Sequence, residues 1–491
     1  MRKRRDFLKS AAAGAAAAVS GGAADPHKMI GIQVGAVSFV DEGTGKVLDI
    51  LQERAAVNTL FLAVFTYGRG IAGRQVPGQP LPDHGRQEYD LNFHGGNYGT
   101  VHARYYKDTG IKPEDTRAPD HGSLDIIADV LPEARKRGMR TILWAEDVWR
   151  YDIPGIEKLQ ETDLLGRKVR RMCMNNPYHR SFLLGLVEDY TRSSDIDGIM
   201  WGSERHGALG AALGAQHGGG GGSPDSVGCF CEFCETKARR QGIVRIDRVK
   251  QGYRELAGYV KAARSGTRPV DGHFVTFLRL LMKYPEILAW EQFWHDSLRE
   301  VYAVMRDKAH SIRPGVQAGW HIWHNNSFSP FYRAQQDLKE LAKCSDFLKM
   351  VMYHNCGGER MAGYIDSVTG NIFGDLPKQE ALDFEYRVMD YRERAYEQIP
   401  YAGFSGDYVY REARRAIKGA AGTGVLIWPG IDIDIPTGRN HSKSTRQGTK
   451  DAVLGAFRSG AHGVILSRKY SEMTLDHLSG AGDAARELKI A

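Results

Sequence analysis

The sequence has no apolar stretch long enough to cross a bilayer, and only 6 of its 491 residues are cysteine. Since a transmembrane helix needs about 20 mostly apolar residues, we expect no membrane-spanning segment. The net charge of +7 is modest, because residues 2–9 contribute +4 of it and leave +3 elsewhere. Such a balance does not indicate a nucleic-acid-binding protein. With 42% hydrophobic residues, the chain can instead build a large core.

The basic residues near the start belong to a segment with the composition of an export signal. A basic start, an alanine-rich middle and small residues precede Asp25. Arg4-Arg5, followed by DFLK, resembles the twin-arginine signal of bacteria. We therefore expect residues 1–24 to be a signal peptide and residues 25–491 to form one catalytic domain. The twin-arginine machinery would then deliver the folded protein to the periplasm or the medium. A chance basic tail before an alanine helix is the alternative.

Eight short apolar runs separated by helical patterns predict a (β/α)8 barrel. The runs cover residues 29–39, 58–66, 139–144, 196–200, 316–320, 347–352, 425–428 and 463–466. Helical patterns fall at residues 47–54, 125–137, 182–191, 287–310, 382–397, 410–418 and 475–488. Nearly every run ends in Trp, His, Tyr, Asp or Glu, as in barrels whose active site lies at the carboxyl ends of the strands. A doubly wound sheet also alternates strands and helices, but no glycine fingerprint follows the first run.

A long segment at residues 67–120 interrupts this alternation after the second run. It has many Gly and Pro residues and few apolar runs. Connections of this length are usually either functional lids or disordered segments. Its aromatic residues, together with His94 and His102, favour an ordered lid over the barrel mouth.

Four of the cysteines are spaced like metal ligands. Cys229, Cys231 and Cys234 form a C-x-C-x-x-C motif after the fourth run, and Cys173 lies upstream. Four thiolates suit a closed tetrahedral Zn²⁺ site, and three cysteines so close in sequence cannot easily pair with one another. We therefore expect a structural zinc in an insertion after the fourth strand. Disulfides, which an exported protein can form, are the alternative.

These motifs resemble the zinc-containing bacterial β-galactosidases of glycoside hydrolase family 42, which are barrels of clan A type. The resemblance covers roughly residues 173–316 and lies in the cysteines, in the letters NPYHR at 176–180, and in Ser203-Glu204. It implies a carbohydrate substrate and a general acid/base role for Glu204. Ser203 stands where that family has Asn, and no Glu ends the seventh run, where the family places its nucleophile. A distant relative is therefore indicated.

Glycoside hydrolysis requires two carboxyl groups flanking the bond that breaks. Glu204 follows the fourth run, and it suits the proton donor if Trp201 and a closed lid raise its pKa. Its partner is expected to be Asp432, because the ends of the fourth and seventh strands face each other across the barrel. Glu472 and Asp147 are the further candidates.

Each carboxyl group also has a plainly structural interpretation. Glu204 can pair with the adjacent Arg205, Asp432 can cap a turn, and Glu472 can pair with Arg468.

Aromatic and basic side chains at the strand ends are expected to bind the substrate, because aromatic faces stack on sugar rings. The predicted contacts are Trp144, Asp147, Trp201, Arg205, His321, Trp323, His324, Tyr353, His354, Trp428, Arg468 and Tyr470. Any one of these aromatic side chains can equally belong to the core. The histidines can bind hydroxyl groups or a catalytic metal.

The sequence thus predicts an exported glycoside hydrolase acting on an oligosaccharide or glycoside with retention. A sugar-binding barrel without catalysis and a metal-dependent hydrolase using the strand-end histidines are the alternatives. The sugar, the linkage and assembly into a homo-oligomer are left open.

Export is testable on the chain itself. Replacing both Arg4 and Arg5 by Lys should stop export and leave folded protein in the cytoplasm, since the twin-arginine route requires this pair. Fractionation of cells followed by immunoblotting measures the outcome. Export at normal levels would show that another route is used.

Overall fold

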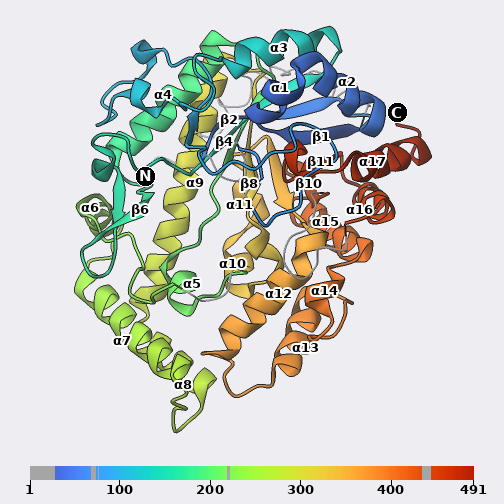
Figure 1. The fold of residues 1–491 in the computed structure, drawn as a ribbon. Helices are drawn as coiled ribbons and strands as arrows, with labels where there is room; N and C mark the ends of the chain where they lie inside the picture. Colours follow the sequence, from blue (N-terminus) through green and yellow to red (C-terminus); the bar gives the residue numbers. More distant parts are fainter. Residues whose placement is uncertain (1–27, 68–72, 76, 218–221, 434–443, 491) are drawn as a thin grey trace, which may run out of the picture.

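The computed structural model describes residues 28–67, 73–75, 77–217, 222–433 and 444–490 (Figure 1). The predicted signal peptide lies outside these ranges. Eight parallel strands form the barrel: β1 (Met29–Val34), β2 (Thr59–Tyr67), β4 (Arg140–Glu146), β7 (Gly198–Gly202), β8 (Gln317–Ile322), β9 (Phe347–Val351), β10 (Leu426–Asp432) and β11 (Gly463–Ser467). Because β1 pairs with both β2 and β11, the barrel is closed. The predicted (β/α)8 fold is therefore confirmed.

Helices surround these strands, and the longest is α9 (Glu286–Ile312). The others are α1 (Ala36–Glu42), α2 (Thr44–Ala55), α3 (Ile126–Lys136), α4 (Pro177–Ser193), α5 (Ala208–Leu213), α6 (Glu232–Arg240), α7 (Ile246–Arg264), α8 (His273–Lys283), α10 (Pro330–Gln335), α11 (Leu338–Ala342), α12 (His354–Thr369), α13 (Lys378–Met389), α14 (Ile399–Ala402), α15 (Gly406–Gly419), α16 (Arg446–Arg458) and α17 (Leu475–Glu487). None of these described helices is long and apolar enough to cross a membrane.

Two predicted elements have different bounds in the structure. The first apolar run holds both β1 and α1, because a short apolar stretch does not distinguish a strand from a buried helix. The helix predicted at residues 382–397 corresponds to α13, which ends at Asp390 in a left-handed conformation with φ 58°. The other predicted helices and strands overlap observed elements, whereas α12 and α16 were not predicted.

The barrel interior contains an apolar layer formed by alternate residues of the strands. Its members are Met29, Phe61, Ala63, Ile142, Trp144, Met200, Phe347, Trp428 and Ile465. Trp428 stacks on Phe347 with 4.3 Å between ring centroids. Gly319 makes room for this stack, since a Cβ atom there would lie 2.3 Å from the Phe347 ring. Trp144 and Trp428, both predicted to bind substrate, are thus core residues that are 2% exposed.

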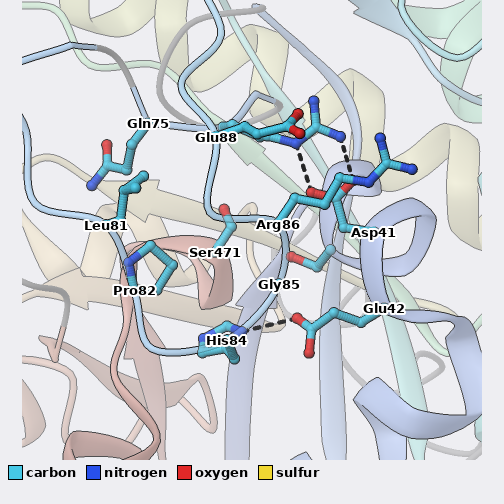
Figure 2. A pocket seen from close by; sticks show the side chains of 12 residues that line it. Asp41, Glu42, Gln75, Leu81, Pro82, His84, Gly85, Arg86, Glu88 and Ser471 are labelled. Carbon is cyan, nitrogen blue, oxygen red and sulfur yellow. Dashed lines mark hydrogen bonds and ion pairs between the residues drawn. The ribbon is translucent and has the colours of Figure 1, made fainter.

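Side-chain contacts hold the segment predicted as a lid beside the carboxyl ends of β1 and β11. Its β3 (Gly95–Asn97) pairs antiparallel with β2. His84 lies between Glu42 of α1, at 2.9 Å, and the Met473 carbonyl oxygen, at 3.0 Å. Arg74 forms an ion pair with Asp41, also of α1. Figure 2 shows the contact of His84 with Glu42 beside a small pocket between α1 and the segment.

Trp428→Ala tests the placement of this side chain in the barrel core. Removing a buried aromatic ring costs about 3–5 kcal/mol, so the free energy of unfolding should fall by this amount. Trp428→Phe, which keeps a ring against Phe347, should cost less. Denaturant titration measures both. An unchanged free energy of unfolding would contradict the interior placement.

Candidate active site

Polar side chains replace the apolar layer toward the carboxyl ends of the strands. Register pairs Glu146 of β4 with Gly202 of β7, Gly202 with His321 of β8, and His321 with Lys349 of β9. Side chains alternate along a strand, so residues two positions beyond the apolar layer also face the interior. Glu146 follows Trp144 in this way, and Lys349 follows Phe347. The barrel interior therefore ends in a polar layer that contains titratable side chains.

Lys349 is the cation within this layer. It is fully buried, and its Nζ donates to Gln33 Oε1 of β1 and to Tyr353 Oη, the latter at 3.1 Å. Ser467 of β11 donates to the same Gln33 oxygen at 2.7 Å. Burial lowers the pKa of Lys349, and nearby Glu146 opposes that shift. Strands β1, β9 and β11 are thereby joined by hydrogen bonds at the base of the site.

Glu204 lies just beyond β7, and its Oε1 is 2.8 Å from His321 Nε2. Burial by itself would raise the pKa of Glu204, but the contact with His321 and the charge of Arg360 lower it overall. Its side chain is 46% exposed, so water partly screens these charges. Glu204 is therefore ionised at neutral pH. The expectation of a raised pKa was wrong.

Glu146 is a second carboxyl group in the same layer. It is 5% exposed, and burial raises its pKa well above the usual value, with the negative charge of Glu204 adding to the effect. Gly202 leaves space for it, since a Cβ atom there would lie 2.8 Å from Glu146 Oε2. The surroundings therefore favour the protonated form of Glu146 and the ionised form of Glu204. Burial is the main cause for Glu146, and the like charge of Glu204 adds to it.

Trp201 and Arg205 lie away from this pair. Trp201 faces outward and contacts Tyr302 of α9, with ring centroids 5.7 Å apart, so it cannot raise the pKa of Glu204. Arg205 is buried and pairs with Asp147 at 2.5 Å and with Glu161 at 3.3 Å. These contacts give Arg205 and Asp147 a structural role in place of the predicted contact with substrate.

Asp432, the expected partner of Glu204, lies at the start of α12. Its carboxylate accepts hydrogen bonds from the backbone N–H groups of Asn355, at 2.9 Å, and Cys356, at 2.8 Å. His354 Nδ1 lies 3.1 Å from the same carboxylate. Burial alone would raise the pKa of Asp432, but His354 and the two N–H groups lower it. This helix-capping role is the structural alternative named for Asp432 above.

The residues predicted after β11 pack beneath the lid segment. Glu472 forms an ion pair with Lys469, whose Nζ lies 3.5 Å away. Lys469 directly follows Arg468, the partner that the sequence suggested for Glu472. Tyr470 is buried and stacks on His84, with 4.2 Å between ring centroids. The charge of Arg468 acts to lower the pKa of Tyr353, although burial raises that pKa overall.

The three strand-end histidines have separate partners. His321 contacts Glu204, His324 contacts Tyr408 and Arg360, and His354 contacts Asp432. Among the residues that the structure describes, only the four cysteines form a group able to hold a metal ion. These three histidines therefore do not converge on a shared metal position in the described part of the chain.

Several buried polar atoms at the mouth lack a partner among the described residues. They are Gln33 Nε2, His217 Nε2, His321 Nδ1 and Trp323 Nε1. Buried polar atoms are normally hydrogen-bonded, so these atoms are positioned for water or ligand hydroxyl groups. Trp323 contacts the ring of His217, with ring centroids 5.1 Å apart. Because its Nε1 has no partner among the described residues, Trp323 stays a predicted substrate contact.

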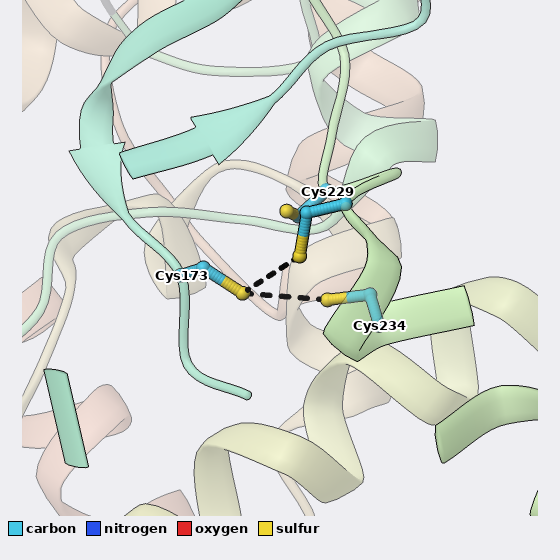
Figure 3. A group of neighbouring side chains, drawn as sticks. Cys173, Cys229 and Cys234 are labelled. Carbon is cyan, nitrogen blue, oxygen red and sulfur yellow. Dashed lines mark hydrogen bonds between the residues drawn. The ribbon is translucent and has the colours of Figure 1, made fainter. Parts of the chain in front are cut away.

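Cys173, Cys229, Cys231 and Cys234 form a buried cluster whose sulfur atoms all lie within 4.8 Å of one another (Figure 3). Cys173 Sγ is 3.5 Å from Cys231 Sγ and 3.4 Å from Cys234 Sγ. Disulfide sulfur atoms would be about 2.05 Å apart. Tetrahedral Zn–S bonds of about 2.3 Å place sulfur atoms about 3.8 Å apart. The cluster is thus suited to a metal ion.

Neighbouring N–H groups point at these sulfur atoms. Asn175 donates through its backbone N–H to Cys173 Sγ and through its side chain to Cys234 Sγ, each at 3.4 Å. The Thr162 N–H donates to Cys229 Sγ at 3.4 Å. Such donors favour the thiolate form that binds metal. The cysteines join the hairpin of β5 (Gln160–Thr162) and β6 (Lys168–Met172) to α6.

No family model matches the sequence, and no curated protein is similar to it in sequence. Solved structures do share its fold. The alignment with a β-galactosidase from the Antarctic haloarchaeon Halorubrum lacusprofundi has 13% identity and a TM-score of 0.52, and it covers 93% of this chain and 57% of that chain. The PgaB (BpsB) glycoside hydrolase domain of Bordetella bronchiseptica gives 11% identity and a TM-score of 0.50, with coverage of 95% and 99%.

An α-L-fucosidase isoenzyme 2 from Paenibacillus thiaminolyticus has 11% identity and a TM-score of 0.49, with coverage of 94% of this chain and 49% of that one. This chain thus spans 49% of the fucosidase and 57% of the β-galactosidase. At these identities the likeness concerns the (β/α)8 fold alone.

Proposed function

We propose that the protein is a glycoside hydrolase whose catalytic pair is Glu146 and Glu204. The observation that carries the proposal is the placement of both carboxyl groups at the carboxyl ends of β4 and β7, where their surroundings shift the two pKa values in opposite directions. Glycosidases need one carboxyl group that holds a proton and another that is ionised. The barrel fold shared with solved glycosidases and the unpartnered polar atoms at the mouth support the same function.

Glu146, being protonated, donates its proton to the leaving-group oxygen in this proposal. Glu204 attacks the sugar, and the hydrogen bond to His321 orients its carboxylate. The sequence suggested Glu204 as the acid and Asp432 as its partner, so in this proposal Glu204 takes the other role and Glu146 replaces Asp432. We keep retention as the proposed outcome, which requires the two carboxyl groups to lie about 5–5.5 Å apart.

A screen of chromogenic glycosides and of plant and bacterial polysaccharides identifies the substrate, and two variants then test the pair. Glu146→Gln should slow turnover of substrates with poor leaving groups by about 10²–10⁴-fold, the usual range for general acid catalysis. Activated aryl glycosides should lose less. Glu204→Gln should lose turnover of both kinds. Glu385→Gln, which changes another buried carboxyl group with a raised pKa, is the control.

The pH dependence adds a second readout. A raised pKa keeps Glu146 protonated at neutral pH, so kcat/KM should fall only when the pH rises through that pKa. Glu146→Gln should lack this alkaline decline. If Glu204→Gln alone spared activated substrates, the roles would be the reverse of those proposed. Full activity of both variants would exclude the pair and leave Asp432 or Glu472 to be examined. Sugar binding without any turnover would favour the non-catalytic alternative.

We also infer that the cysteine cluster holds a structural Zn²⁺, supported by its four sulfur donors and their spacing. Four thiolates leave no open position, so the ion would supply stability only. It would hold the segment between β5 and α6 through which Arg205 supports the site. Export of the folded protein by the twin-arginine route is proposed together with this metal, because the ion would be bound before export.

Purified protein should contain about one zinc per chain. Zinc contributes about 10–16 kcal/mol in small zinc-finger peptides, so its removal should clearly lower stability here too. Cys234→Ala should lose the metal and melt at a lower temperature. Cys344→Ala, which removes a buried thiol outside the cluster, should keep the metal. Elemental analysis and thermal melting measure these effects. Wild-type protein without zinc and with these cysteines as disulfides would remove the inference.

A further inference from the structure

Arg360 is a cation at the barrel mouth that contacts no carboxylate among the residues described by the structure. It lies on α12, is partly buried, and has no ion pair among the described residues. Its Nη1 donates to His324 Nδ1 at 3.0 Å, and its guanidinium lies over the Tyr353 ring at 5.8 Å. Placing a guanidinium in a partly buried position without an opposite charge is unfavourable unless something else compensates it.

A chain of hydrogen bonds fixes this side chain. Tyr408 donates its hydroxyl hydrogen to Ser327 Oγ at 2.8 Å, so the Tyr408 oxygen is free to accept from His324 Nε2, 3.1 Å away. His324 therefore carries its hydrogen on Nε2, which leaves Nδ1 as the acceptor for Arg360. Burial, followed by the charge of Arg360, lowers the pKa of His324 well below its usual value. The arginine is thus held by a neutral ring and keeps its full charge.

Glu204 is the ionised carboxylate whose pKa the charge of Arg360 helps to lower. Its hydrogen bond goes to His321, and no ion pair joins it to Arg360 among the described residues. Lys349 adds a buried amine on the same side of the barrel, with no carboxylate within ion-pair distance in the described chain. Arg360 is therefore attracted by Glu204 over a longer distance but has no carboxylate in direct contact within this part of the chain.

We propose that Arg360 binds an acidic group of the substrate, which is a glycan carrying a carboxylate or a sulfate ester. A guanidinium donates two parallel N–H bonds to either group, and such charged pairs are stronger than neutral hydrogen bonds. This inference rests on the proposed function and adds the substrate class. The competing interpretation is that Arg360 only packs on Tyr353.

Binding is measured in a Glu146→Gln background, which blocks turnover without changing charge because Glu146 is already neutral. The probes for calorimetry are oligogalacturonates, oligoglucuronates and sulfated galactan oligosaccharides, each with its neutral counterpart. At least one acidic probe should bind about 10-fold or more tightly than its counterpart. Comparing uronates with sulfates separates the two sources of negative charge.

Arg360→Gln in this background should weaken binding of the acidic probe about 10–100-fold, the range expected for losing a charged hydrogen-bonded pair. Neutral probes should change less than about threefold. Arg387→Gln removes the same charge from an exposed site on α13 and is the control. Tyr408→Phe, which removes the support of His324, should weaken acidic binding less than Arg360→Gln does. Acidic probes that bind no better than neutral ones would overturn the proposal.

Equal weakening of acidic and neutral probes by Arg360→Gln would also overturn it, since that is the effect of lost packing. Wild-type turnover separates this failure from failure of the proposed function. Hydrolysis of neutral glycosides without preference for acidic ones leaves a glycosidase and removes the role of Arg360. Selective binding of acidic probes with no hydrolysis of any probe keeps the role of Arg360 and removes the glycosidase.

Discussion

The parallel pairing of β4 with β7 is the constraint on which the site depends. Its register sets Glu146 opposite Gly202, two residues before Glu204, so the two carboxyl groups share one part of the mouth. Only glycine at 202 leaves room for the Glu146 carboxyl group. Because burial and like charge oppose ionisation of Glu146, while His321 favours ionisation of Glu204, one proton is retained. The strand register thereby creates the chemical difference between the two groups.

The surrounding structure keeps this pair in place. The apolar layer closes the barrel below it, and Lys349 links β9 to Gln33 of β1 across the base. Beyond β7, Arg205 reaches Asp147 and Glu161, which connects the residue after Glu204 to the β5–β6 hairpin. The cysteine cluster fixes that hairpin against α6. A metal ion remote from the chemistry would thus stabilise the loop that carries the ionised carboxylate.

The sequence predicted the barrel, the cysteine cluster and the placement of Glu204 after the fourth strand, because apolar runs and cysteine spacing are local features. It did not predict which face each side chain takes. Glu146 faces the interior, whereas the adjacent Asp147 pairs with Arg205. Trp201 contacts α9, although it follows the interior residue Met200. These directions depend on strand register. A lysine within the apolar run at 347–352 was the overlooked signal for Lys349.

The protonation of Glu146 is the central claim, and infrared difference spectroscopy tests it without a substrate. At pH 7, wild-type protein should show a protonated carboxyl band that Glu146→Gln removes. Glu385→Gln, measured in parallel, identifies the band of the other buried carboxyl group with a raised pKa. A spectrum in which Glu146→Gln removes only a carboxylate band would show that Glu146 is ionised and would contradict the account.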